Sequence, residues 1–358
     1  MSRFILPRLR QIEAYTPGEQ PQDMKYIKLN TNESPFSPSP LLKERINAEA
    51  LERLNLYSDP TLKGLRKKLA NYYDLGMENV TCTNGSDEVL AFVFMAFCSD
   101  GVVFPDISYG FYQVFAKTYG LSYQQFPLKE DFTIDYREYL DIGKTIVIAN
   151  PNAPTGIALP LHEIEEIIKT NPHHLVVIDE AYVDFGGESA IALVPKYDNL
   201  LVVRTYSKSR SLAGMRLGFA IGNRAVIADL EKLRYSTNPY NVDSLALLAG
   251  EAALDDEQYY KKNMRAVIAN REFTKKALTA LGFIMTNSKA NFLFAKHSDI
   301  SGRELYQKLK SKGILVRHFE QERIKEYIRI TIGTAEQMTR LVTATKEILA
   351  KAGRKINA

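Results

Sequence analysis

The chain has 358 residues, enough for about two domains, and its content of 45% hydrophobic and 25% charged residues excludes widespread disorder. Two cysteines are too few for a disulfide-stapled scaffold and fit a reducing compartment. The net charge of +4 comes from scattered Lys and Arg and does not indicate nucleic acid as a partner, and no run approaches the roughly 18 apolar residues that a membrane helix needs.

The first half of the chain predicts an arm followed by an α/β domain. The stretch to about Pro40 is rich in Pro, Asn and Ser and predicts an extended arm, after which a helix is expected from Leu41 to about Leu54. Between residues 60 and 250, short apolar runs alternate with helical patterns such as Leu161–Lys169. Such runs fit strands covered on both faces, which predicts a mostly parallel sheet sandwiched by helices. The runs are Thr145–Ala149, Leu175–Ile178, Leu200–Val203 and Leu217–Ile221.

From Asp255 onward the pattern changes to α+β. An amphipathic stretch from about Asp256 to Leu281 predicts a long helix that carries the chain across a soft boundary near residue 250. We therefore expect an N-terminal arm (1–40) that joins the smaller domain, a large domain (41–250) and a smaller α+β domain (251–358). In the last of these we expect strands near Ala290–Ala295 and Tyr327–Ile332 and helices at Gly302–Ser311 and Ala335–Ala350.

Polar residues follow three of the predicted strands, at the edge where α/β sheets bind ligands. They are Asn150–Gly156, Asp179–Tyr182 and Arg204–Arg216. A fourth polar segment, Asn84–Glu88, opens an apolar helix and offers backbone N–H groups, a hydroxyl and the positive end of a helix dipole, which suit a phosphate. A plain N-cap by Ser86 or Asp87 is the simpler explanation of that segment alone. If the sheet forms as predicted, the four segments converge on one crevice.

Lys208 and Asp179 are the candidates for chemistry in this crevice. Lys208 lies between two serines after a buried strand, where partial desolvation frees an amine for Schiff-base chemistry, although a surface charge is the ordinary role of a lysine. Asp179 ends an apolar strand, where a carboxylate needs a partner such as a protonated ring nitrogen, unless it is only structural. A phosphate cradle, an amine, an acid and polar groups for a phenolic oxygen together are what pyridoxal 5'-phosphate requires.

In these segments the sequence resembles the fold type I pyridoxal-phosphate aminotransferases of class I/II, and the resemblance extends over essentially the whole chain. Asn84–Glu88, Asp179–Tyr182 and Thr205–Arg216 match in type, order and spacing, and Leu29–Phe36 is similar to the N-terminal signature of the histidinol-phosphate aminotransferases. The resemblance implies a large domain and a smaller one. It also implies transfer of the amino group of L-histidinol phosphate to 2-oxoglutarate, giving imidazole acetol phosphate and L-glutamate in histidine biosynthesis.

The resemblance further implies the roles of single residues. Lys208 would bind the cofactor covalently and act as the catalytic base, Asp179 would pair with the pyridinium nitrogen, and Tyr182 would bind the phenolic oxygen. Tyr109 would stack on the ring. A homodimer would be required, because Tyr57 would reach the phosphate of the partner subunit. The other groups around the phosphate would be Gly85, Ser86, Asp87, Thr205, Ser207 and Arg216.

On the substrate side, Arg329 matches the arginine that binds a carboxylate in the family, although an exposed strand arginine would look the same in the sequence. Histidinol phosphate has no carboxylate, so its phosphate would use the region that takes the α-carboxylate of glutamate. Tyr15, Asn32 and Asn291 match positions near the substrate.

The sequence departs from the family pattern at one position. The usual pattern places Asn directly before Pro-Thr-Gly, where it contacts the phenolic oxygen of the cofactor, and this chain has Ala153 there. Either Asn152 makes the contact through a shifted turn, which we expect, or Tyr182 makes it alone.

Other functions remain open or are disfavoured. Threonine-phosphate decarboxylase has nearly the same motifs, and an aromatic or other amino-acid aminotransferase also fits. A nicotinamide-dependent dehydrogenase would need G-x-G-x-x-G after a first strand, which is absent, and a binding module would not need Lys208, Asp179 and Arg216 together. Apart from the adjacent pair His173 and His174, the five histidines show no metal-ligand spacing, so no metal is expected. The N-terminus lacks a signal-peptide pattern, so we expect a cytoplasmic enzyme without membrane contact.

Overall fold

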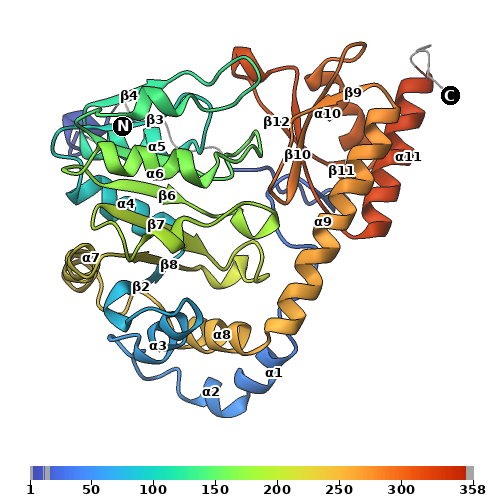
Figure 1. Cartoon of the computed structure of the whole chain (residues 1–358). Helices are drawn as coiled ribbons and strands as arrows, with labels where there is room; N and C mark the ends of the chain where they lie inside the picture. The colour runs from blue at the N-terminus through green and yellow to red at the C-terminus, as the bar shows by residue number, and fades with distance from the viewer. Residues whose placement is uncertain (1–2, 11, 13–16, 352–358) are drawn as a thin grey trace.

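The computed structural model describes residues 3–10, 12 and 17–351, and the larger of the sheets in that part has seven strands (Figure 1). The strand order is β2-β8-β7-β6-β5-β3-β4. Strand β8 is antiparallel to both neighbours and the other neighbouring pairs are parallel, which confirms the predicted mostly parallel sheet. The strands are β2 (Val80–Asn84), β3 (Val102–Pro105), β4 (Tyr123–Phe126), β5 (Thr145–Ala149), β6 (Val176–Asp179), β7 (Leu200–Thr205) and β8 (Leu217–Gly222).

The four apolar runs form β5 to β8, and every residue in these strands is buried. Alternate residues face two separate core clusters, so that Ile146 and Ile148 pack on one face of the sheet and Val147 and Ala149 on the other. Helices α3, α6 and α8 cover the first face and α4, α5 and α7 the second. Their bounds are α3 (Lys63–Tyr72), α4 (Ser86–Ala96), α5 (Phe111–Tyr119), α6 (Leu161–Thr170), α7 (Arg224–Thr237) and α8 (Ser244–Asp255).

The predicted single helix from Leu41 to Leu54 is wrong. The chain forms two short helices, α1 (Leu41–Arg45) and α2 (Ala48–Glu52), because Ile46 leaves the helical conformation with φ −95° and ψ 72°. The side chain of Asn47 then accepts a hydrogen bond from the Ala50 N–H and caps the second helix.

The C-terminal part holds, within the described residues, a four-stranded antiparallel sheet of order β12-β13-β10-β9. The long helix is α9, whose N-terminus is capped by the side chain of Asp256, and it runs along this part of the molecule (Figure 1). The two strands expected here are β10 and β13, and the two expected helices are α10 and α11. The bounds are α9 (Glu257–Ala280), β9 (Phe283–Met285), β10 (Phe292–His297), α10 (Gly302–Ser311), β12 (Arg317–His318), β13 (Ile328–Thr331) and α11 (Ala335–Lys351).

The N-terminal arm is attached to the C-terminal part. Strand β1 (Ile27–Lys28) pairs in parallel with β11 (Ile314–Leu315), and Leu29 is buried in the core that α9, α10 and α11 share with the smaller sheet. A separate aromatic and aliphatic cluster contains Phe132 together with Phe294 and Tyr327, so it joins residues from the two parts. The division into three units stays a prediction.

Short 3-10 helices complete the connections. They lie at Pro7–Leu9, Met77–Asn79, Tyr136–Tyr139, Val183–Phe185, Ala190–Leu193, Ala213–Met215 and Glu322–Ile324. Among the described residues, none of the helices has both the length and the apolar character required to cross a membrane.

Candidate active site

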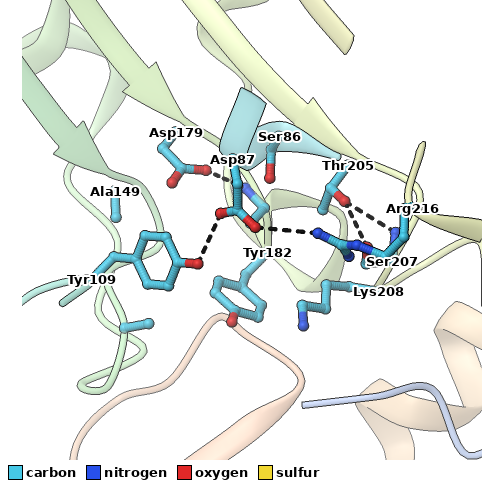
Figure 2. Close-up of a pocket in the computed structure, with 12 residues that line it drawn as sticks. Ser86, Asp87, Tyr109, Ala149, Asp179, Tyr182, Thr205, Ser207, Lys208 and Arg216 are labelled. Carbon is cyan, nitrogen blue, oxygen red and sulfur yellow. Dashed lines mark hydrogen bonds and ion pairs between the residues drawn. The ribbon is translucent and has the colours of Figure 1, made fainter. Parts of the chain in front are cut away.

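The predicted polar segments meet in one pocket at the carboxyl edge of the larger sheet (Figure 2). Asp179 ends β6 and Thr205 ends β7. The fourth segment also follows a strand, because Asn84 ends β2, which the sequence did not reveal. The lining residues are Ser86, Asp87, Tyr109, Ala149, Ala153, Asp179, Ala181, Tyr182, Thr205, Ser207, Lys208 and Arg216.

One corner of the pocket is suited to an anion. Gly85 is the N-cap of α4 and no side chain caps this helix, so the simple N-cap explanation does not hold for Ser86 or Asp87. Gly85 has φ +76°, a backbone conformation that favours glycine, and a Cβ there would lie 2.7 Å from Nη2 of Arg216, so the guanidinium lies close to the start of the helix. The Thr205 hydroxyl donates to the Ser207 hydroxyl at 3.0 Å in the same corner. First-turn N–H groups, hydroxyls and a guanidinium are the usual ligands of a phosphate.

Asp87 joins this corner to Tyr109. Its Oδ1 accepts a hydrogen bond of 2.8 Å from the Tyr109 hydroxyl, and its Oδ2 lies 3.2 Å from Nη2 of Arg216 (Figure 2). Tyr109 therefore has its ring held beside the pocket by its hydroxyl, an arrangement compatible with stacking on a planar ligand.

The Asp179 carboxylate is buried beside a residue that the sequence analysis missed. The hydroxyl of Tyr112, on α5, donates a hydrogen bond of 2.8 Å to Oδ2, and the Ala181 N–H donates to Oδ1 at 3.2 Å. Burial raises the pKa of Asp179 to about 6, and the nearby Asp87 charge adds to the rise, while Tyr112, Ala181 and Lys208 oppose it. A cation placed against this carboxylate would favour its charged form.

Lys208 lies opposite, on the loop that follows β7. Its Nζ is 3.4 Å from the carbonyl oxygen of Thr31 and 5.9 Å from the centre of the Tyr182 ring. The Tyr182 hydroxyl accepts a hydrogen bond of 3.0 Å from Nδ2 of Asn32. Lys208 and Tyr182 line the same pocket as Asp179 (Figure 2).

Asn152, which we expected to contact the phenolic oxygen of the cofactor, does not line the pocket. The Asn152 side chain is buried in the turn, where Nδ2 donates to the Ile107 carbonyl at 2.9 Å and Oδ1 accepts from the Ser108 hydroxyl at 2.8 Å. Ala153 lines the pocket instead. Because the Asn152 amide is already bonded within the scaffold, Tyr182 is the better candidate for the contact with a phenolic oxygen.

A wider cavity of about 430 Å³ continues from the pocket and shares Tyr109, Tyr182 and Lys208 with it. Asn32 and Arg329 line this cavity, as expected, and so does Arg317, which the sequence analysis missed. The short Arg-His strand that carries Arg317 has no distinctive sequence pattern, and its position depends on pairing with β13.

The predicted substrate residues differ in how close they come to this cavity. Asn291 lies behind the lining, where its Nδ2 donates to the Asn32 carbonyl at 3.0 Å. Tyr57 is 82% exposed and stacks on Tyr240 with ring centres 4.3 Å apart, and it does not line the pocket. Tyr15 lies outside the described residues.

The residues present fit pyridoxal phosphate. The anion corner, the buried carboxylate and the amine border one pocket, so a phosphate, a ring nitrogen and an aldehyde can be met at the same time. Among the described residues, no group of three or more His, Cys, Asp or Glu side chains is placed to hold a metal ion.

Comparison with known proteins gives a consistent result. The family model for aminotransferase class I and II matches residues 24–344. A histidinol-phosphate aminotransferase of Brachyspira hyodysenteriae is 50% identical over 352 residues, covering 98% of this chain and 99% of that protein. One from a Marinomonas species is 50% identical over 355 residues, covering 97% and 100%. The crystal structure of the Sinorhizobium meliloti histidinol-phosphate aminotransferase with pyridoxal-5'-phosphate has a TM-score of 0.89 at 22% identity, covers 98% of this chain and 99% of its own, and supports the fold.

Proposed function

Because this chain belongs to the class I and II aminotransferases, we propose that it transfers the amino group of L-histidinol phosphate to 2-oxoglutarate, with pyridoxal phosphate as cofactor. The products are imidazole acetol phosphate and L-glutamate, and the reaction serves histidine biosynthesis. One observation carries the choice of substrates: Lys208 and two arginines, Arg317 and Arg329, line a single cavity. The names of relatives that are 50% identical over nearly their whole length support it.

The cofactor would be held at three points. Arg216, the hydroxyls of Ser86, Thr205 and Ser207, and the first-turn N–H groups of α4 would take its phosphate. Asp179 would pair with its ring nitrogen. The Tyr182 hydroxyl would bind its phenolic oxygen, and Tyr109 would cover one face of its ring. When bound, the cofactor supplies an electron sink for the carbanion that forms at Cα of the substrate.

Lys208 would be both the point of covalent attachment and the base. Its Nζ would take the proton from Cα of the amine substrate and return a proton to the cofactor side, so that the amino group is transferred without net consumption of acid or base. Asp179 would contribute by keeping a positive charge on the ring nitrogen, which would stabilise the developing negative charge. Tyr182 and Thr31 hold the amine over the pocket.

The two arginines would serve both halves of the reaction. Arg329 donates from Nη2 to the Asn30 carbonyl at 2.9 Å, which orients its guanidinium in the cavity. It would bind the α-carboxylate of 2-oxoglutarate and glutamate, and Arg317 would add a second guanidinium for the doubly charged phosphate of the donor. Asn32 and Asn291 support this wall through the Asn32 backbone.

We also propose that the enzyme is a homodimer. Tyr57 is exposed in a surface cavity, and Leu51, Leu54 and Leu56 beside it are each more than half exposed. A partner subunit would cover these side chains and bring its Tyr57 to the phosphate corner of this one. We place the reaction in the cytoplasm, which the buried, unpaired thiols of Cys82 and Cys98 support.

A product assay with a panel of donors tests the proposal. L-Histidinol phosphate with 2-oxoglutarate is expected to yield glutamate, whereas aromatic amino acids give much slower turnover and threonine phosphate releases no carbon dioxide. Glutamate formation only from an aromatic donor, or carbon dioxide from threonine phosphate, would replace the proposed substrate.

A further inference from the structure

Arg323 lies in the segment that follows β12, and its side chain bonds to the loops that follow β3 and β4. Its Nη1 lies 2.9 Å from Oδ2 of Asp106, and its Nη2 donates to the carbonyls of Leu128 and Lys129 at 2.8 and 3.1 Å. The other oxygen of Asp106 accepts from the Leu128 N–H at 2.9 Å. One guanidinium therefore binds three acceptors, and the carboxylate it pairs with is itself fixed by the backbone.

This ion pair lies one residue away from each of two stretches of the chain that form walls of the wider cavity. Asp106 precedes the wall formed by Ile107, Ser108, Tyr109 and Gly110, and Arg323 precedes Ile324 on the wall that also carries Arg317, Phe319 and Gln321. Ile107 and Ile324 belong to one buried cluster. The two walls come from distant parts of the chain, and the Arg323–Asp106 contact joins them one residue away from the cavity on each side.

We propose that the Arg323–Asp106 pair is a positioning device that holds the stretch of chain carrying Arg317 against the stretch carrying Tyr109, and so fixes where Arg317 lies in the donor cavity relative to Lys208. The proposal rests on the proposed function for the identity of the donor. Neither residue lines the cavity, so neither contacts the substrate. The pair acts because a donor with an anionic group at one end and its reacting amine at the other must be met at both ends at once.

Two single variants and their combination test the pair. Arg323→Gln is expected to raise the KM for histidinol phosphate about tenfold, the loss expected for about 1.4 kcal/mol of a charge-assisted contact, with kcat and cofactor affinity nearly unchanged. Asp106→Asn removes the ion pair but leaves the bonds of Arg323 to the carbonyls of Leu128 and Lys129, so it should raise the KM less than Arg323→Gln does. The double variant should be no worse than Arg323→Gln, because the ion pair is lost in both single variants. Arg323→Lys keeps the charge but not the two-pronged geometry, so it should give an intermediate KM.

Lys312→Gln is the matched control, because Lys312 pairs with Glu347 at 2.5 Å and lines none of the cavities around the site. A KM effect no larger than in this control, or additive effects in the double variant, would overturn the proposal. Amide hydrogen exchange of residues 317–324 in the cofactor-loaded protein gives a readout without substrate: exchange should quicken in Arg323→Gln and not in Lys312→Gln. If the wild type fails to use histidinol phosphate, the proposed function fails, and unchanged exchange would then separately refute the pair.

Discussion

The hydroxyl of Tyr112 donates a hydrogen bond of 2.8 Å to Oδ2 of Asp179, and both side chains are buried. Tyr112 also meets Tyr109 edge to face, with ring centres 5.6 Å apart. One residue of α5 therefore contacts both the acid proposed for the ring nitrogen and the ring proposed to stack on the cofactor. It is a positioning residue, since it does not line the pocket itself.

Tyr112→Phe removes this hydrogen bond and little else. The bond lowers the pKa of Asp179, so its loss should raise that pKa and shift the acidic limb of the pH–rate profile upward. Cofactor affinity should fall about tenfold, within the range for a hydrogen bond to a charged group. Fluorescence titration of the cofactor-free protein with pyridoxal phosphate measures the affinity. A cofactor affinity and a pH–rate profile equal to those of the wild type would show that Tyr112 only fills space.

The raised pKa of Asp179 predicts how pH changes the stability of the cofactor-free protein. The folded state holds this proton up to a pH of about 6, whereas the unfolded chain releases it near 3.8. The free energy of unfolding therefore falls as pH rises from about 4 to about 6, by about 3 kcal/mol in total. Asp179→Asn removes this dependence, so denaturant unfolding should show wild type losing stability relative to the variant across that range and not above it. A constant difference between the two proteins would contradict the assignment.

Lys208→Ala should bind the cofactor without turning it over. The pocket keeps its anion corner and Asp179, but the base is lost, so kcat should fall by more than about a thousandfold. The bound cofactor should also become removable by dialysis. Lys196→Ala, at a lysine whose side chain is 62% exposed, serves as the control. Appreciable turnover by the Lys208 variant would exclude it as the base.

Arg329→Gln should weaken the binding of both substrates, because the same guanidinium is proposed to bind the carboxylate of 2-oxoglutarate and the phosphate of histidinol phosphate. Removing one bidentate contact should raise each KM roughly tenfold to a hundredfold. Arg317→Gln should raise the KM for histidinol phosphate more than that for 2-oxoglutarate. Equal effects of the Arg317 change on both substrates would mean that it does not distinguish the phosphate.

Asn152→Ala separates a structural role from a cofactor contact. The amide bonds to the Ile107 carbonyl and to the hydroxyls of Ser108 and Thr155, so the variant should lose about 1–3 kcal/mol of stability. The absorbance spectrum of the bound cofactor should be unchanged. A shifted spectrum with unaltered stability would restore the direct contact that the sequence had suggested.

The sequence predicted the central strands and the chemistry at their ends because both are local signals. A buried strand such as β6 is uniformly apolar, and an aspartate that ends it stands out. Strand β4 was missed because it lies at the edge of the sheet, where Gln124 and Gln125 are exposed and no apolar run forms. The break between α1 and α2 was missed because the helical pattern continues through Ile46.

Two residues at the site, Tyr112 and Arg317, could not be identified from local sequence patterns. Tyr112 reaches Asp179 across 67 positions of the chain, and Arg317 reaches the cavity only through the pairing of β12 with β13. Each lies in a stretch that reads as ordinary helix or strand. The contact expected from Asn152 stays a prediction: the family pattern places the asparagine at the position of Ala153, and whether a neighbouring Asn can replace it depends on the turn, in which the Asn152 amide bonds to the Ile107 carbonyl.

The most direct test of the central claim is a half-reaction monitored by absorbance. The purified, cofactor-loaded enzyme is mixed with L-histidinol phosphate in the absence of an acceptor. The visible band of the bound cofactor should disappear within one turnover and return when 2-oxoglutarate is added, which would identify both substrates. A band that stays unchanged with histidinol phosphate but responds to another amine would contradict the proposed donor.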